Sequence, residues 1–405
     1  MPDGHPFGMV VVVVCDSVGC GNAPDAAAFG DEGANTLAHV VEQTGLRLPH
    51  LASLGIEGVP GVPDLGGGGR NALPAACGRM FSRSPAKDTM VGHWELMGVV
   101  ADRAFPTYPD GFPRELLDEF ERRIGTATLG NKSASGTVIL DELGEEHLRT
   151  GAPIVYTSGD SVFQIAAHVD RFDLDALYAI STTARDLLVG EHGVGRVIAR
   201  PFKGIAKGEF ERLAADRRDY TLAPVRPTAL DCLVKAGVAT HGIGKIHDIF
   251  AGRGLSTYEK TASNSDGIEA TCVAMTERQA PFIFTNLVDF DSLYGHRNDV
   301  TGYAEALKEF DTALPNLVEA LPEDGLLLIT ADHGNDPTWP GTDHTREAVP
   351  LIAMGSRVAP GTALDTRSSF ADLGATVADN FAADGNLQGS SFLGEITSEP
   401  GSSPA

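Results

Sequence analysis

Carboxylate and imidazole side chains follow one short apolar stretch of the chain. Residues 326–330 are bounded like a buried strand, Asp332 and His333 come directly after them, and His344 lies eleven residues beyond His333. Carboxylates and neutral imidazoles are ligands for divalent metals of intermediate hardness. An isolated pair of this kind more often caps or stabilises a turn than binds a metal, so a metal site needs support from a second cluster.

Two further apolar stretches end in the same kinds of side chain. Residues 282–288 are followed by Asp291 and His296, and residues 9–15 are followed by Asp16. Open α/β sheets place their sites where parallel strands end. Acids or acid-plus-His pairs at three such ends are hard to explain by packing alone. The sequence therefore predicts a metal centre built from the beginning, middle and end of the chain.

Thr89 is the candidate nucleophile. It stands just before residues with helical periodicity at Met90, Trp94 and Met97, so it could be the first residue of a short helix. Exposed N–H groups at a helix start favour a phosphoryl group, and a metal can lower the pKa of the hydroxyl. The simpler alternative is that Asp88 or Thr89 only caps the helix. Both interpretations stay open at this point.

Composition limits the classes of partner. The chain has 405 residues, 42% of them hydrophobic, which suits a globular protein of two domains. A formal charge of −24 and a pI near 4.8 argue against nucleic acid or an anionic membrane as a partner. The five cysteines include no close C-x-x-C pair, which fits a reducing compartment. With no signal peptide or membrane span recognisable in the sequence, we expect a cytoplasmic protein.

The pattern of elements predicts an α/β fold with a doubly wound sheet. Residues 9–15 are apolar on both faces, which is typical of a central strand in a parallel sheet. Helices are expected at 264–276 and 301–321, the second as a crossover between two strands. Lys245 follows a strand-like stretch at 238–243 and is a candidate phosphate contact, although such a lysine is more often simply solvated.

The middle of the chain has strands and helices of its own. We predict that residues 101–220 form a smaller inserted α+β cap domain, with helices near 112–123 and 173–189. The core domain would then comprise residues 1–100 and 221–398. Residues 399–405 are expected to be a disordered tail.

Several long motifs in the same order resemble those of the phosphopentomutase family of the alkaline phosphatase superfamily. They are K-D-T-M-x-G-H-W-E at 87–95, T-S-x-D-S-V-F-Q-I-A-A-H at 157–168, G-K-I-x-D-I-F at 244–250, D-F-D-x-x-Y-G-H-R at 289–297, and A-D-H-G-N-D-P-T-W-P-G-T-D-H-T-R-E at 331–347. The resemblance covers nearly the whole chain. It implies an alkaline-phosphatase-like core sheet with an inserted cap.

The resemblance also implies two divalent metal ions, usually manganese, held by seven protein groups. The ligands of one ion match Asp291, His296 and His344; those of the other match Asp16, Asp332, His333 and Thr89. Thr89 would also carry the phosphoryl group. The positions that hold the sugar phosphate match Ser158, Asp160, Arg196, Arg212 and Lys245, with Arg217 as the rival of Arg212.

The reaction implied is an isomerisation in nucleoside catabolism. A phosphorylated Thr89 would convert ribose 5-phosphate, or its 2-deoxy analogue, into a 1,5-bisphosphate and then into the 1-phosphate, while the cap excludes water. One alternative is a two-metal phosphatase or phosphodiesterase of the same superfamily. Another is a non-catalytic sensor of phosphosugars or metals. The preference for ribose or deoxyribose, the metal used in the cell, the resting phosphorylation state and the oligomeric state stay open.

Overall fold

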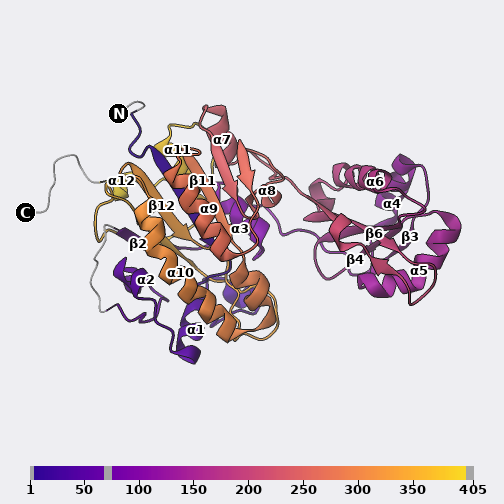
Figure 1. Ribbon diagram of the computed structural model, residues 1–405, viewed down its shortest axis with the longest axis horizontal. Coiled ribbons are helices and arrows are strands. Elements are labelled where there is room, and N and C mark those ends of the chain that lie inside the picture. The colour runs from indigo at the N-terminus through magenta and orange to yellow at the C-terminus, as the bar shows by residue number, and fades with distance from the viewer. Residues whose placement is uncertain (1–3, 68–74, 398–405) are drawn as a thin grey trace, which may run out of the picture. The chain divides into compact units, whose positions relative to one another are not determined.

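Strand β1, Met9–Cys15, is the centre of the larger sheet of the computed structural model, which describes residues 4–67 and 75–397 (Figure 1). It pairs in parallel with β11, Phe282–Leu287, on one side and with β12, Gly325–Thr330, on the other. Every residue of the three strands is buried. The central position predicted from the valine run is confirmed.

Within the described part of the chain, this sheet has eight strands in the order β10-β9-β11-β1-β12-β13-β2-β14. The strands from β10 to β12 run parallel to one another, whereas β13 runs antiparallel to both β12 and β2. Sequence patterns did not indicate the last three strands. The remaining bounds are β9 Thr240–Ile243, β10 Thr257–Glu259, β13 Val349–Met354, β2 Ala75–Met80 and β14 Ala363–Arg367.

Helices cover both faces of this sheet, so the predicted doubly wound α/β fold is confirmed. In Figure 1, α9 (Asn264–Thr276) and α10 (Val300–Ala320) lie in front of the strands, and α3 (Thr89–Leu96) lies behind them. Helix α10 links β11 to β12 and thereby crosses β1, as expected. The other helices of this part are α1 Thr36–Thr44, α2 Pro49–Ser53, α7 Ala229–Lys235, α8 Ile246–Ile249, α11 Ala371–Asn380 and α12 Leu393–Ile396, with 3-10 turns at Ala26–Phe29, Ile56–Gly58 and Gly295–Arg297.

The chain folds as two compact units. One comprises Met1–Arg103 with Pro224–Ala405, and the other comprises Ala104–Ala223. The tail expected to be disordered, 399–405, lies outside the described residues.

All residues of the smaller unit are described, and they form a six-stranded sheet in the order β3-β4-β5-β6-β7, with β8 paired to β6. Helices α4 and α6 pack on one face around Phe120 and Phe163, and α5 packs on the other around Tyr156 and Phe202. Helix α5 had not been predicted. The bounds are β3 Leu129–Ser133, β4 Ile154–Thr157, β5 Val162–His168, β6 Arg196–Lys203, β7 Glu211–Arg212, β8 Arg218–Thr221, α4 Arg114–Ile124, α5 Gly136–Thr150 and α6 Leu174–Leu187, with 3-10 turns at Gly190–His192 and Ala214–Asp216.

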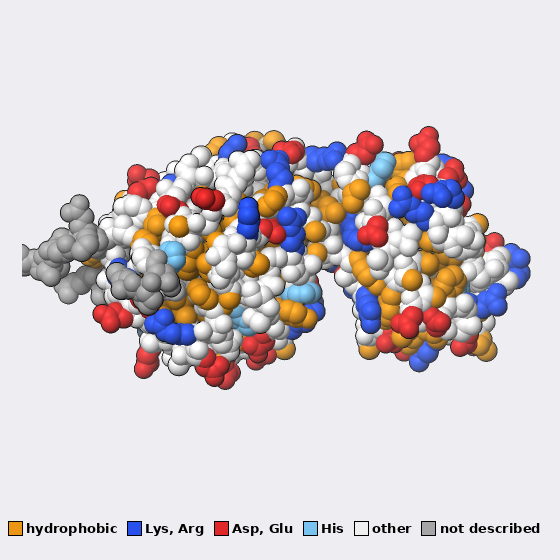
Figure 2. Space-filling model, turned by 90° about the horizontal axis from the view of Figure 1, so that it is seen from above, with side chains coloured by type: hydrophobic (Ala, Val, Ile, Leu, Met, Phe, Trp, Pro, Cys, Tyr) orange, Lys and Arg blue, Asp and Glu red, His pale blue; other side chains and the backbone are white. Residues whose placement is uncertain are grey.

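The surface shows no segregation of charge on the face drawn in Figure 2, where acidic and basic side chains are interspersed. Within residues 4–67 and 75–397, no helix combines the length and the apolar character that crossing a membrane requires.

Candidate metal centre

Three neighbouring parallel strands deliver acidic side chains to one edge of the core sheet. Asp16 follows β1, Asp332 lies just beyond β12, and Asp291 lies in the π-helix Phe290–Tyr294 just beyond β11. Because β1 is in parallel register with both neighbours, the carboxyl ends of these strands meet. Residues far apart in the sequence are thereby brought to one place.

One group of potential ligands is formed by Asp16, Asp332 and His333, whose ligand atoms all lie within 4.8 Å of one another. His333 Nε2 is 3.5 Å from Asp16 Oδ1 and 3.2 Å from Asp332 Oδ2. All three side chains are buried. The hydroxyl of Thr89 lies beside this group, with Oγ1 3.1 Å from His333 Nε2.

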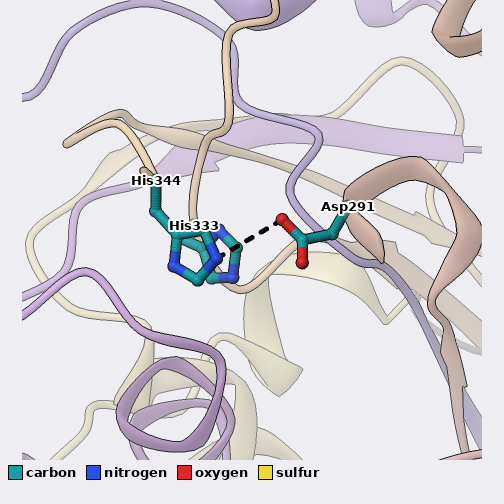
Figure 3. Close-up of side chains that lie close together, drawn as sticks. All are labelled: Asp291, His333 and His344. Atoms are coloured by element: carbon teal, nitrogen blue, oxygen red, sulfur yellow. Dashed lines mark ion pairs between the residues drawn. The ribbon is translucent and has the colours of Figure 1, made fainter. Parts of the chain in front are cut away.

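A second group surrounds Asp291. Its Oδ2 is 3.1 Å from His296 Nε2 and its Oδ1 is 3.4 Å from His344 Nε2, and the two imidazole Nε2 atoms are 3.2 Å apart. Figure 3 shows Asp291 facing the rings of His333 and His344, which stack with their centroids 3.8 Å apart. Asp291, His333 and His344 also bring ligand atoms within 4.8 Å, so His333 borders both groups.

Backbone carbonyl groups fix the tautomer of the three histidine side chains in the centre, His296, His333 and His344. In each ring Nδ1 lies within hydrogen-bond distance of a carbonyl oxygen, and because a carbonyl can only accept, Nδ1 must carry the proton. The pairs are His344 Nδ1 with Lys87 O at 2.6 Å, His296 Nδ1 with Thr342 O at 2.7 Å, and His333 Nδ1 with Gly334 O at 3.1 Å. In its neutral form, each ring therefore directs an Nε2 lone pair toward the carboxylates, which is the arrangement of metal-binding histidines.

Two carboxylate oxygens in the centre have no hydrogen-bond partner among the described residues. They are Asp16 Oδ1 and Asp332 Oδ2, and both are buried. The second oxygen of each carboxylate is held: Asn286 Nδ2 donates to Asp16 Oδ2 at 2.9 Å, and the Ser17 N–H donates to Asp332 Oδ1 at 3.1 Å. A buried acceptor without a partner costs about 1–3 kcal/mol. A divalent cation coordinated by these oxygens removes that cost, so the side chains fit such an ion.

The electrostatics of the centre also favour a cation. Burial, and then the neighbouring carboxylates of Asp332 and Asp291, raise the pKa of Asp16 well above its ordinary value. The hydrogen bond to Asp291 raises the pKa of His296 to about 9. Carboxylates crowded in a buried place repel one another, and a bound cation relieves that repulsion.

Comparisons with known proteins agree on one family. Residues 8–385 match the family model described as the Metalloenzyme superfamily. Phosphopentomutase from Caldanaerobacter subterraneus subsp. tengcongensis is 52% identical over 96% of this chain and 98% of its own length. Phosphopentomutase from Carboxydothermus hydrogenoformans is 53% identical over 96% of this chain and 99% of its own. This chain belongs to the phosphopentomutase family.

Membership of the phosphopentomutase family makes the protein an isomerase of the intramolecular phosphotransferase class. The superfamily match and the two groups of side chains indicate that it uses divalent metal. Among solved structures, a phosphoglycerate mutase from Leishmania mexicana matches with a TM-score of 0.45 and 14% identity, over 96% of this chain and 98% of that one.

Thr89 occupies the first position of helix α3, and Asp88 is the N-cap. The Asp88 carboxylate accepts a hydrogen bond from the Val91 N–H at 3.0 Å, so the capping role belongs to Asp88 and leaves the Thr89 hydroxyl available. Helix α3 approaches the strand end closely, because a Cβ added at Gly92 would lie 2.3 Å from Asp332 O. That contact sets Thr89 beside the first group.

Sequence patterns missed the side chains that hold the candidate ligands. His93 lies one helical turn after Thr89; its Nδ1 donates to Thr89 O at 2.8 Å and is 3.1 Å from Asp332 Oδ2. Asn335 Nδ2 donates to Asp291 Oδ1 at 2.8 Å. The signals available were the four-residue spacing of His93 from Thr89 and, for Asn286, a polar residue inside an apolar strand.

The residues that the resemblance to phosphopentomutases implies for binding the sugar phosphate are divided between the two units. The smaller unit carries four of them, and the larger unit carries Lys245, which is exposed and is the N-cap of α8. Lys87, the basic neighbour of Thr89, is already paired: its Nζ lies 3.0 Å from Asp31 Oδ2. The four residues of the smaller unit are Ser158, Asp160, Arg196 and Arg212.

Proposed function

We propose that this chain interconverts the 1-phosphates and 5-phosphates of ribose or 2-deoxyribose. The reaction would pass through a phosphothreonine at Thr89 and a pentose 1,5-bisphosphate. The observation that carries the proposal is the position of Thr89 Oγ1, which lies 3.1 Å from His333 Nε2 at the start of a helix and beside two groups of metal-ligand side chains.

We assign two divalent ions to the centre, with Mn²⁺ as the favoured metal because the donors mix carboxylate and imidazole. The geometry around Asp291 supports one ion site, and the two unsatisfied carboxylate oxygens support the other. The first set is Asp291, His296 and His344; the second is Asp16, Asp332, His333 and Thr89.

Bound divalent cations supply charge neutralisation at the phosphoryl oxygens and lower the pKa of the Thr89 hydroxyl. The chain itself supplies orientation. Asp88 ends the extended backbone and starts α3, so that backbone N–H groups of the first turn are available to phosphoryl oxygens. His93 fixes the turn by binding Thr89 O, and its other contact, Asp332, belongs to the ligand set.

The proposed cycle exchanges phosphoryl groups without water. One P–O bond at Thr89 Oγ1 breaks while a P–O bond to the sugar hydroxyl forms, which yields the bisphosphate. The second phosphoryl group then returns to Thr89 Oγ1, and the other pentose phosphate leaves. The cycle requires a phosphothreonine that persists until a sugar arrives, which is what separates a mutase from a phosphatase of the same superfamily.

Phosphopeptide mapping of freshly purified protein, combined with an assay of both products, tests the proposal. We expect phosphate on the peptide that contains Thr89, and ribose 1-phosphate formed from ribose 5-phosphate in excess over free phosphate. Thr89→Ala should lower mutase activity by about a thousandfold or more. Thr276→Ala, at the exposed end of α9, is the matched control and should leave activity unchanged. Free phosphate as the main product would overturn the mutase assignment and favour a hydrolase.

A further inference from the structure

Ser17 has a backbone conformation that is unusual for its residue type. It follows Asp16 at the end of β1, and its φ of 73° lies in the left-handed region that favours glycine. Among the residues that the structure describes, it is the one buried non-glycine residue with a positive φ. The Val18 N–H donates to Cys15 O at 3.1 Å, so Ser17 is the third residue of a tight turn, where a positive φ ordinarily calls for glycine or asparagine. A strained residue of this kind persists only where its surroundings hold it.

Contacts with two other segments hold Ser17 in this conformation. Its N–H donates to Asp332 Oδ1 at 3.1 Å, and its carbonyl oxygen accepts from the Asn335 N–H at 3.1 Å. Its Oγ lies 3.0 Å from the Tyr303 hydroxyl, and both groups are buried. The dihedral angles of a residue set the directions of its N–H and its carbonyl relative to each other. A change of φ at Ser17 would therefore break at least one of the two backbone contacts.

These contacts lead to the carboxylates of the metal centre. The Ser17 N–H occupies Asp332 Oδ1 and leaves Oδ2 to face the centre, 3.2 Å from His333 Nε2. Asn335, whose N–H is bound by the Ser17 carbonyl, donates from Nδ2 to Asp291 Oδ1 at 2.8 Å. Ser17 also directly follows the acid at the end of β1. One residue thus connects acidic side chains from the ends of three strands.

Tyr303 holds the Ser17 side chain from helix α10. It is the fourth residue of that helix, and its side chain is fully buried. Its ring packs against Phe290, with the centroids 6.0 Å apart, and Phe290 directly precedes Asp291. Burial raises the pKa of the Tyr303 hydroxyl well above its ordinary value, so the group stays protonated at neutral pH and keeps its hydrogen bond to Ser17.

We propose that Ser17 is a positioning residue of the metal centre, whose left-handed backbone, held by the Tyr303 hydroxyl, aims the carboxylates of Asp332 and Asp291 at a divalent ion. Without that hydrogen bond, a residue with a side chain can relieve its unfavourable φ by rotation, which withdraws the N–H from Asp332 and the carbonyl from Asn335. Glycine has no such strain and can keep the turn unaided. The inference rests on the metal ligands assigned under the proposed function.

Titration of the full-length, metal-free protein with Mn²⁺ tests the proposal in two variants of Ser17. Both Ser17→Gly and Ser17→Ala remove Oγ, but only alanine is strained at the native φ. We expect the Kd for Mn²⁺ to rise about tenfold or more in Ser17→Ala and to stay within about threefold of the parent value in Ser17→Gly. If the side chain served only to fill space, the order would be reversed, because glycine leaves the larger cavity. Equal affinities in the two variants, or weaker binding in Ser17→Gly, overturn the inference.

Tyr303→Phe tests the hydrogen bond with the serine in place. The substitution removes the hydroxyl that contacts Ser17 Oγ and keeps the ring beside Phe290. We expect the Kd for Mn²⁺ to rise as in Ser17→Ala, and to rise no further when Tyr303→Phe is added to Ser17→Gly. Tyr220→Phe is the matched control: it removes a hydroxyl that donates to Tyr178 O at 3.3 Å in the smaller unit, and it should bind Mn²⁺ like the parent protein. Parent-like affinity in Tyr303→Phe overturns the inference.

Thermal melting of the metal-free proteins separates positioning from folding. Ala382→Gly is the matched control for relief of a positive φ, because Ala382 has a φ of 48° and is exposed just beyond α11. It should leave the affinity for Mn²⁺ unchanged. A lower melting temperature of Ser17→Ala, without any change in the Mn²⁺ affinity of the folded protein, would show a purely structural role and overturn the inference.

The inference and the proposed ligand set fail separately. Asp332→Asn should weaken Mn²⁺ binding more than either variant of Ser17, and parent-like binding in Asp332→Asn would overturn the ligand set. Weak binding in Asp332→Asn, together with equal affinities in Ser17→Gly and Ser17→Ala, would overturn the positioning role alone. The titrations involve no turnover, so their outcome does not depend on phosphorylation of Thr89.

Discussion

The three histidines of the metal centre and two buried histidines of the smaller unit use their ring nitrogens differently. In the metal centre, each imidazole has Nδ1 committed to a carbonyl and Nε2 facing carboxylates. In the smaller unit, His147 donates from Nδ1 to Ala152 O at 2.7 Å and accepts at Nε2 from the His168 N–H at 2.9 Å. His168 likewise donates from Nε2 to Gly204 O at 2.8 Å and accepts at Nδ1 from the Asp170 N–H at 3.1 Å.

Burial alone therefore does not mark a histidine as a ligand. The pKa values move in opposite directions: burial lowers the pKa of His147, whereas the hydrogen bond to Asp291 raises that of His296 to about 9. What distinguishes a candidate ligand is one nitrogen that the backbone leaves free and that points at carboxylate oxygens. In the smaller unit the backbone uses both nitrogens, so the role of His147 and His168 is to join segments of chain.

Replacing one histidine of each unit by leucine is the strongest test of this comparison. His333→Leu removes an Nε2 that faces Asp16 and Asp332, and we expect mutase activity to fall by about a hundredfold or more. The metal-free protein should melt no lower than the parent, because Nε2 satisfies no backbone group and the Gly334 carbonyl that Nδ1 contacts keeps a second hydrogen bond, from the Thr345 N–H at 2.8 Å. Metal content by elemental analysis and metal-free calorimetry check both parts. Retained activity with full metal content contradicts the ligand role.

The strand cores and the ligand types could be predicted from sequence because both depend on local pattern. The valine run of β1 is apolar on both faces, and it defines a central strand without any knowledge of its neighbours. Asp332 and His333 could be recognised as candidate ligands because they directly follow such a run.

The missed elements depend on contacts that no local pattern contains. Helix α5 begins at Gly136 and includes Gly144, where an added Cβ would lie 2.4 Å from the Phe210 ring, so tertiary packing overrides a weak helix propensity. Strand β13 contains Pro350, and a proline argues against a strand when only the sequence is known. The carbonyl oxygen of Lys87 that fixes the tautomer of His344 is 257 residues away in the chain, and its role cannot be seen before the backbone is placed.

Removal of metal should destabilise the larger unit and leave the smaller one unaffected. The crowded carboxylates of the centre lose their counter-charge, and a ligand present at a thousandfold its Kd contributes about 4 kcal/mol of stability to the unit that binds it. Hydrogen exchange measured with Mn²⁺ and after chelation should show increased exchange in β1, β11 and β12 but not in β5 and β6. Equal changes in both sets of strands would contradict the assignment of metal to the larger unit.

His147→Leu is the counterpart of His333→Leu and should reverse its pattern. The substitution leaves the buried Ala152 carbonyl and His168 N–H without partners, at a cost of about 1–3 kcal/mol each in the free energy of unfolding of the smaller unit. Denaturant unfolding checks the loss, and metal content should stay that of the parent protein. A variant that loses metal while keeping its stability would contradict the structural role of His147.

The smallest expected effect is a pH dependence that belongs to the smaller unit alone. Burial lowers the pKa of His147 below its ordinary value of 6.5, and His168 and Arg171 lower it further. The unfolded chain therefore binds a proton more readily than the folded one, so the stability contributed by neutral His147 is complete above about pH 6.5 and declines as pH falls below it. Protonation at Nε2 also removes the acceptor for the His168 N–H.

Denaturant midpoints of the smaller unit at pH 7.5 and 5.5 should differ more in the parent protein than in His147→Leu. If the midpoint changed by the same amount between the two pH values in both proteins, His147 would not change its protonation on unfolding. The two groups of histidines would then differ in geometry but not in protonation.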